Sequence, residues 1–230
     1  MSEASLIIIL LFTLYFVLHS LLASLWVKQH VATCCPGLVP YYRLLFNGVA
    51  LLLVLPLLYV IWRYPGETLW QWQGLGFYLT SALALGAVGL FIYSLSLYDM
   101  HEFLGLRQIA EHSAQVRDQE HLKISPLHRF VRHPWYFIIL VLIWTRDLTT
   151  TQLLTYSLVT LYLVVGSRLE ERKLIAYHGE VYAHYRKRVP GLIPLPWKFL
   201  RKDEARALMG EYAHSKPQTT ESEHDQNPSD

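Results

Sequence analysis

The stretch SLIIILLFTLYFVLHSLLASLWV, residues 5–27, is 23 residues long and contains no Asp, Glu, Lys or Arg. A helix needs about 20 such residues to cross a bilayer. Backbone polar groups cannot stay unpaired in lipid, so the stretch is expected to be helical there. It lacks a preceding basic region, and its apolar part exceeds the roughly 7–15 residues of a cleavable signal peptide. It therefore predicts a membrane helix that is retained.

Four further uncharged runs follow along the chain. The first two are long enough to cross a bilayer. The last two are separated only by Arg146 and Asp147, which predicts a helical hairpin. This hairpin either crosses the membrane twice or re-enters it without crossing, and the two alternatives stay open at this point. The expected helices cover residues 5–27, 42–63, 74–98, 131–146 and 148–172.

The distribution of basic residues predicts an orientation. If all five helices cross, 18 of the 20 Lys and Arg residues fall on one side of the membrane. Basic residues accumulate on the cytosolic side of membrane proteins. We therefore expect an all-α polytopic bundle of about five transmembrane helices, with the N-terminus outside and the C-terminus in the cytosol.

The composition agrees with a membrane protein. Hydrophobic residues make up 53% of the chain and charged residues 17%, below the roughly 25% charged residues of a soluble domain. The net charge of +2 and the lack of a basic block argue against a nucleic-acid binder. Cys34 and Cys35 are adjacent, and the histidines have no regular ligand spacing, so we expect no metal site.

The chain is expected to form one domain over residues 1–200. A short amphipathic segment over 201–213 follows it. The remaining tail, 214–230, is polar and has no periodicity, which is typical of a disordered segment.

The motif Arg132-His133-Pro134 precedes the fourth uncharged run. Proline suits the first turn of a helix, where its missing N–H has no cost. The N–H groups before it, the helix dipole and the two basic side chains together favour an anion. An ordinary interfacial helix start, with basic side chains against lipid phosphates, is the alternative interpretation.

Glu170 and Glu171 follow the last uncharged run directly. Adjacent residues on a helix point about 100° apart, so at least one carboxylate is expected to face the bundle, where it would hold an amine. The alternative is a solvated helix end on which the glutamates pair with Arg168, Arg172 or Lys173.

His19 lies well inside the first uncharged run. An ionisable residue within a membrane helix is a functional candidate by default. A neutral histidine that is hydrogen-bonded between helices is equally compatible with the sequence.

The order of these motifs resembles that of the integral-membrane methyltransferases, the isoprenylcysteine carboxyl methyltransferase and phospholipid methyltransferase group. RHPWY at 132–136, EERKL at 170–174 and GxxYxxY followed by VP at 179–190 carry the resemblance. It is closest to the branch of NnrU-like proteins and methanethiol S-methyltransferases, in which His19-Ser20 and the GLRQ of 105–108 also have counterparts.

The resemblance covers roughly residues 15–196 and implies S-adenosylmethionine as cofactor. Its methionine part carries an ammonium and a carboxylate, which need an acidic and a basic partner, and its sulfonium is attracted to aromatic faces. The implied acceptor is a small or lipophilic thiol or carboxylate, and the implied location is the bacterial inner membrane. The resemblance implies that Arg132 and His133 are catalytic, that His19 and His101 bind the acceptor, and that the cofactor is held by Arg132, His133, Pro134, Tyr136, Glu170, Glu171, Tyr185 and Gln108.

Two features depart from the family pattern. Ile138 stands where the family usually has glycine, and TRDLTTTQ at 145–152 replaces a proline-containing turn. Two other hypotheses stay open. One is a non-enzymatic membrane protein of the NnrU type, linked to nitrogen-oxide or respiratory metabolism, which would explain the missing glycine. The other is a membrane reductase that uses a nicotinamide cofactor, because some sterol reductases share related C-terminal motifs.

Overall fold

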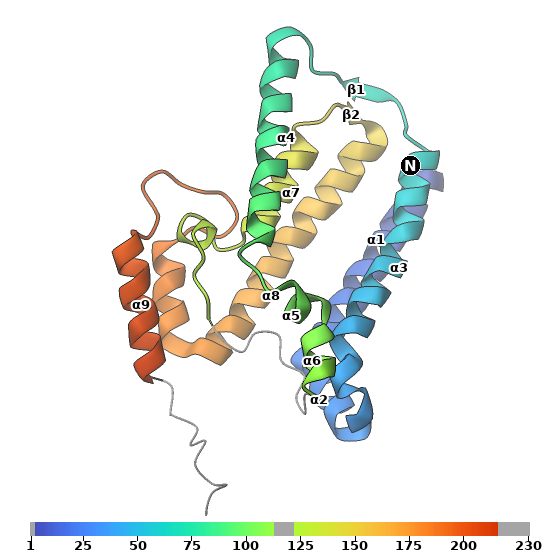
Figure 1. Cartoon of the computed structure of the whole chain (residues 1–230). Coiled ribbons are helices and arrows are strands. Elements are labelled where there is room, and N and C mark those ends of the chain that lie inside the picture. The colour runs from blue at the N-terminus through green and yellow to red at the C-terminus, as the bar shows by residue number, and fades with distance from the viewer. Residues whose placement is uncertain (1–2, 113–121, 216–230) are drawn as a thin grey trace, which may run out of the picture.

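The computed structural model describes residues 3–112 and 122–215, and these residues are mostly helical (Figure 1). The longer helices are α1 (Glu3–Leu22), α2 (Leu25–Cys34), α3 (Tyr42–Arg63), α4 (Gly74–Leu95), α7 (Pro134–Trp144), α8 (Thr150–Arg188) and α9 (Lys202–Ser215). The shorter elements are η1 (Pro36–Tyr41), α5 (Met100–Leu104), α6 (Leu106–Ala110), η2 (Leu127–Arg129), β1 (Thr68–Trp70) and β2 (Leu148–Thr149).

Within the described residues, three helical stretches are long and apolar enough to cross a membrane: Glu3–Leu22, Pro36–Arg63 and Gly74–Leu95. Their large apolar side chains are mainly exposed, for example Leu52 and Leu85. An apolar surface of this size is expected to face lipid rather than water. The predicted helices in these three regions are confirmed as helices.

Two predicted helix ends were wrong, and a capping side chain explains each. The first helix ends at Leu22, not at residue 27, because the Ser24 hydroxyl accepts a hydrogen bond from the N–H of Val27 and starts α2. The third ends at Leu95, not at residue 98, and Asp99 caps the N-terminus of α5. Polar caps satisfy the N–H groups that a new helix leaves open.

The predicted hairpin is present as α7 and α8, with different lengths from those expected. Helix α7 has 11 residues, or about 16 Å, and starts at Pro134 rather than at residue 131. Helix α8 does not end at residue 172. It runs for 39 residues to Arg188, with a break at Gly179, where φ is 58°.

The tip of the hairpin is tied to the α3–α4 connection. Strand β2 pairs with β1 in an antiparallel ladder, and Thr149 and Gln152 form a capping box at the start of α8. The tip of the hairpin therefore lies beside the connection between α3 and α4.

The helices pack in two groups, α1 with α3 and α4 with α7, and α8 contacts members of both (Figure 1). Ile8, Phe12, Leu57 and Val60 form an apolar core between α1 and α3, against which the first turns of α8 pack. The second half of α8 packs against α9 around Tyr182 and Leu208. This arrangement places the start of α7, the middle of α8 and the loop after α8 close together.

Helix α9 begins at Lys202, covers the rest of the predicted amphipathic segment 201–213 and continues to Ser215. Of the predicted tail, residues 216–230 lie outside the described residues.

Candidate functional site

The segment before α7 is held by the loop that follows α8. The N–H of Arg132 donates to the Pro190 carbonyl at 2.9 Å, and the N–H of His133 donates to the Gly191 carbonyl at 3.0 Å. The N–H groups that we expected to favour an anion therefore bond to protein carbonyls. Pro134 is buried as the first residue of α7, as its missing N–H predicted.

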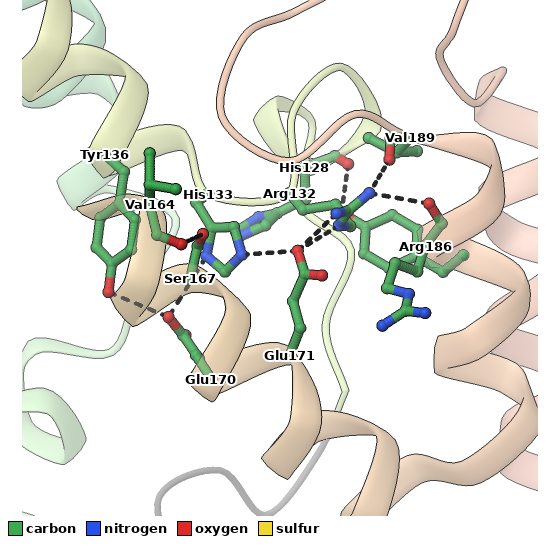
Figure 2. Close-up of polar contacts among 11 residues, drawn as sticks. His128, Arg132, His133, Tyr136, Val164, Ser167, Glu170, Glu171, Arg186 and Val189 are labelled. Atoms are coloured by element: carbon green, nitrogen blue, oxygen red, sulfur yellow. Dashed lines mark hydrogen bonds and ion pairs between the residues drawn. The ribbon is translucent and has the colours of Figure 1, made fainter. Parts of the chain in front are cut away.

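Arg132 and Glu171 form a buried ion pair, shown in Figure 2. Nη2 of Arg132 lies 2.6 Å from Oε1 of Glu171, and Nε donates to the same oxygen at 2.8 Å. The two side chains are 11% and 9% exposed. Nη1 donates to the carbonyls of Arg186 and Val189, so every nitrogen of the guanidinium has a partner.

His133 lies between the two glutamates of α8. Its Nε2 is 3.1 Å from Oε1 of Glu171, and its Nδ1 is 3.4 Å from Oε2 of Glu170. Its ring stacks on Tyr136, with centroids 5.1 Å apart and planes 12° apart, and the Tyr136 hydroxyl donates to Oε2 of Glu170 at 3.2 Å (Figure 2). Both adjacent carboxylates therefore point into one cluster, and the charge of Lys173 also acts on Glu170. We call Arg132, His133, Tyr136, Glu170 and Glu171 the charged cluster.

The electrostatics of the charged cluster favour a protonated His133. Burial lowers the pKa of His133, but the hydrogen bonds to Glu170 and Glu171 outweigh burial and raise the pKa to about 9. Burial raises the pKa of Glu171, but hydrogen bonds from His133 and Arg132 hold it below its usual range. Two positive and two negative charges then balance, so neither sign is left unpaired in a half-buried site.

The hydrogen bonds within the charged cluster reach one oxygen of each carboxylate, Oε2 of Glu170 and Oε1 of Glu171. The side chain of Glu170 is 37% exposed. A carboxylate has about four lone-pair positions. The cluster can therefore accept further hydrogen bonds from a ligand without losing its internal contacts.

Tyr185 and Gln108 lie outside the charged cluster. The Tyr185 hydroxyl donates to the His128 carbonyl at 2.6 Å, and burial raises its pKa. His128 in turn contacts the Ser125 hydroxyl at 2.7 Å. Gln108 donates to the Glu102 carbonyl at 3.2 Å. Tyr185 thus supports the segment that leads to the charged cluster.

The two other predicted histidines are also separate from it. His19 lies on α1, and its Nδ1 is 2.6 Å from the hydroxyl of Tyr162 on α8. His101 lies on α5 and is exposed. The predicted residues therefore divide between the charged cluster and at least two other places in the fold.

Sequence reasoning missed the groups that position Arg132, namely the carbonyls of Arg186, Val189 and Pro190, and it missed Tyr162. Carbonyl contacts carry no side-chain signature, although VPG directly after a basic helix end indicates a tight turn. A tyrosine in an uncharged helix indicates a polar contact, since its hydroxyl needs a partner when it is buried, but the tyrosine alone does not indicate which residue that partner is.

No family model and no solved structure matches the chain. It is 35% identical over 159 residues to the methanethiol S-methyltransferase of Crocosphaera subtropica, covering 65% of this chain and 58% of that protein. It is 29% identical to the methanethiol S-methyltransferase of Pseudomonas deceptionensis, covering 83% of this chain and 73% of that protein. Methanethiol S-methyltransferase 1 of Bradyrhizobium diazoefficiens is 31% identical over 203 residues, 84% of this chain and 68% of that protein. Because this similarity extends over most of both sequences, the chain belongs to the methanethiol S-methyltransferase family.

Proposed function

We propose that this protein is a membrane methyltransferase that transfers a methyl group from S-adenosylmethionine to a small thiol. Methanethiol, the acceptor in the names of its relatives, is the proposed substrate. The observation that carries the proposal is the buried, charge-balanced cluster around Arg132, His133 and Glu171, in a chain of this family.

The charged cluster suits the amino-acid end of the cofactor. An ammonium group would bind the second oxygens of Glu170 and Glu171. The side chains of Arg132 and His133, whose nitrogens already have partners within the protein, would attract the carboxylate by their charge. The ring of Tyr136 provides an aromatic face for a sulfonium. Bound S-adenosylmethionine would supply an electrophilic methyl group on this sulfonium.

Three further residues belong to the proposed cofactor site. Pro134 and Tyr185 keep the segment before α7 in place. Oε1 of Gln108 is buried and accepts no hydrogen bond from the described residues, as expected of a side chain that accepts one from a ligand. His101, exposed on α5, is proposed as an acceptor contact at the entrance.

The thiol must lose a proton, because the thiolate is the nucleophile. With methanethiol, the new carbon–sulfur bond gives dimethyl sulfide and the thiol proton is released. His133 is already protonated at neutral pH and both of its ring nitrogens face carboxylates, so its proposed catalytic role, like that of Arg132, is to hold charge in place.

We further propose five membrane crossings, with the N-terminus outside and the charged cluster at the cytosolic face of a bacterial inner membrane. The three apolar helices and the concentration of basic residues on one side support this topology. Helix α7 is short for a crossing, and the interfacial residues before it complete the span.

The proposal is tested with the full chain in lipid nanodiscs. We expect calorimetry to detect S-adenosylhomocysteine binding, and headspace gas chromatography to detect dimethyl sulfide formed from methanethiol. Glu171→Gln should weaken binding at least tenfold, or about 1.4 kcal/mol. Glu204→Gln is the matched control, because Glu204 forms an exposed ion pair with Arg188 at 2.7 Å, away from the charged cluster.

Wild-type protein that neither binds S-adenosylhomocysteine nor forms dimethyl sulfide would contradict the proposal. If it responded instead to NADPH in a fluorescence titration, the result would favour a reductase. Co-purification with a respiratory partner, without cofactor binding, would favour a non-enzymatic protein.

A further inference from the structure

The proposed reaction needs a proton acceptor that the charged cluster does not provide. Both ring nitrogens of His133 face carboxylates, and the ring is already protonated at neutral pH. We propose that His19 and Tyr162 form a second, intramembrane part of the site, which binds a small uncharged thiol and in which His19 takes its proton. This inference rests on the proposed function and extends it to the acceptor.

The contact between His19 and Tyr162 joins α1 to α8. Nδ1 of His19 lies 2.6 Å from the Tyr162 hydroxyl, although 143 residues separate the two in the chain. The contact is compatible with two tautomers: the Tyr162 hydroxyl donates to a bare Nδ1, or a protonated Nδ1 donates to the tyrosine oxygen and leaves a lone pair on Nε2. A base at Nε2 requires the second tautomer.

Aromatic rings surround this pair. Tyr15 stacks on His19 with centroids 5.4 Å apart, Phe46 lies 4.9 Å from His19, and Phe16 stacks on Tyr162 at 4.1 Å. All five side chains are half-buried. Divalent sulfur makes favourable contacts with aromatic rings. An apolar thiol therefore suits this environment.

Charged thiols do not suit it. Transferring an ionised group from water into such surroundings is costly without a paired partner. The titratable groups that face His19 and Tyr162 are Tyr15, Lys173 and Glu170. Nζ of Lys173 donates to the Ala23 carbonyl at 3.1 Å, at the end of α1. A thiol with a carboxylate or an amine would thus lose its hydration without gaining an equivalent partner.

The pair lies on the same helix as the charged cluster. Tyr162 precedes Glu170 by eight residues on α8, which is about 12 Å along the axis and about 80° around it. The Tyr136 hydroxyl bonds to Glu170 at the charged end of this interval. The charged end and the apolar end of the site therefore lie about two turns apart on one helix.

The chemical step balances. The S–H bond of the thiol breaks and its proton moves to Nε2 of His19, while a sulfur lone pair forms the bond to the methyl carbon. The bond between that carbon and the sulfonium breaks, and its electron pair stays on the departing sulfur. The proton then leaves His19 for water.

The test compares His19→Phe and Tyr162→Phe with wild-type protein in nanodiscs, using methanethiol between pH 6 and 8.5. We expect His19→Phe to lower kcat/KM at least 100-fold at pH 7, as is usual for the loss of a general base. The rate of this variant should then increase with pH, because more thiolate forms in solution. Tyr162→Phe should lower kcat/KM about tenfold. S-adenosylhomocysteine binding should change less than twofold in both variants.

Tyr156→Phe is the matched control, since Tyr156 lies on α8 six residues before Tyr162 and its ring contacts Trp144. Wild-type protein should also prefer ethanethiol to thioglycolate.

Two results for His19→Phe would overturn the inference. One is at least a third of wild-type activity at pH 7, and the other is a loss of activity that does not recover as the pH increases. Should His19→Phe not fold, Tyr162→Phe decides: activity within twofold of wild type across the pH range also overturns it. Wild-type protein without any methyl transfer instead refutes the proposed function itself.

Discussion

Two of the polar contacts that tie α8 to other parts of the chain differ in kind. The contact between Arg132 and Glu171 is a buried ion pair within a cluster of four charges. The contact between His19 and Tyr162 is a single hydrogen bond among aromatic rings. Ionised groups tolerate burial only when they are paired, whereas a neutral hydrogen bond is tolerated within an apolar helix bundle. The comparison separates a site suited to a zwitterion from one suited to an uncharged molecule.

The largest effect is expected for Arg132→Ala. It leaves the buried carboxylate of Glu171 without its main partner, which typically costs about 3 kcal/mol of folding free energy or more. Binding of S-adenosylhomocysteine should also be lost. Thermal unfolding and calorimetry in the same detergent measure both effects. Arg188→Ala, at an exposed ion pair, should cost less than about 1 kcal/mol. Equal losses for the two variants would remove the distinction between the charged cluster and an ordinary surface pair.

The second effect is a pH dependence specific to the charged cluster. The pKa of His133 is raised to about 9 in the folded protein, from about 6.5 in an unfolded chain. Its stabilisation is therefore complete below pH 6.5 and is lost as the pH increases through about 9. The melting temperature should decrease over this interval, by several degrees, and His133→Gln should flatten the profile. A profile unchanged in His133→Gln would show that another group causes the decrease.

A smaller effect is expected at Gly191, beside the guanidinium of Arg132. A Cβ at this position would lie 3.2 Å from Nη2 of Arg132, so Gly191→Ala should displace the guanidinium slightly. We expect S-adenosylhomocysteine binding to weaken a few-fold while the protein stays folded. Gly89→Ala is the control, because nothing lies within 4 Å of a Cβ there. If S-adenosylhomocysteine affinity is unchanged in Gly191→Ala, binding does not depend on the exact position of the Arg132 guanidinium.

The smallest effects separate the two sites directly. Tyr136→Phe removes one hydrogen bond to Glu170 and should weaken S-adenosylhomocysteine binding about two- to fivefold, or about 0.5–1 kcal/mol. Tyr162→Phe should change this affinity less than twofold, because Tyr162 bonds to His19 instead. The reverse order, measured by calorimetry, would place the cofactor nearer to α1 than we propose.

Much of the fold could be predicted from the uncharged runs, since hydropathy is a local property. Several helix ends could not. Ser24 and Asp99 end one helix by capping the next, and a side chain adopts that role only when the backbone turns there. The extension of α8 to Arg188 also depends on packing, because its polar second half is covered by α9.

The candidate site was predictable in part. The motifs with Arg132, His133 and Glu170 stand out because ionisable residues beside apolar membrane helices are costly and therefore often functional. Their partners could not be predicted, since Glu171 has basic neighbours on its own helix at the usual spacing for surface pairs. The carbonyls that hold Arg132 come from the last turn of α8 and the loop after it, and they have no side-chain signature.

The sequence by itself determined that apolar helices form and that charge gathers beside them, because both depend on residues close together in the chain. Only the tertiary structure decided that Arg132 meets Glu171 across 39 residues, and that His19 meets Tyr162 across 143. The physical reason is that both contacts depend on how α8 packs. The first forms only when α8 lies against the start of α7, and the second only when α8 lies against α1 in the apolar interior.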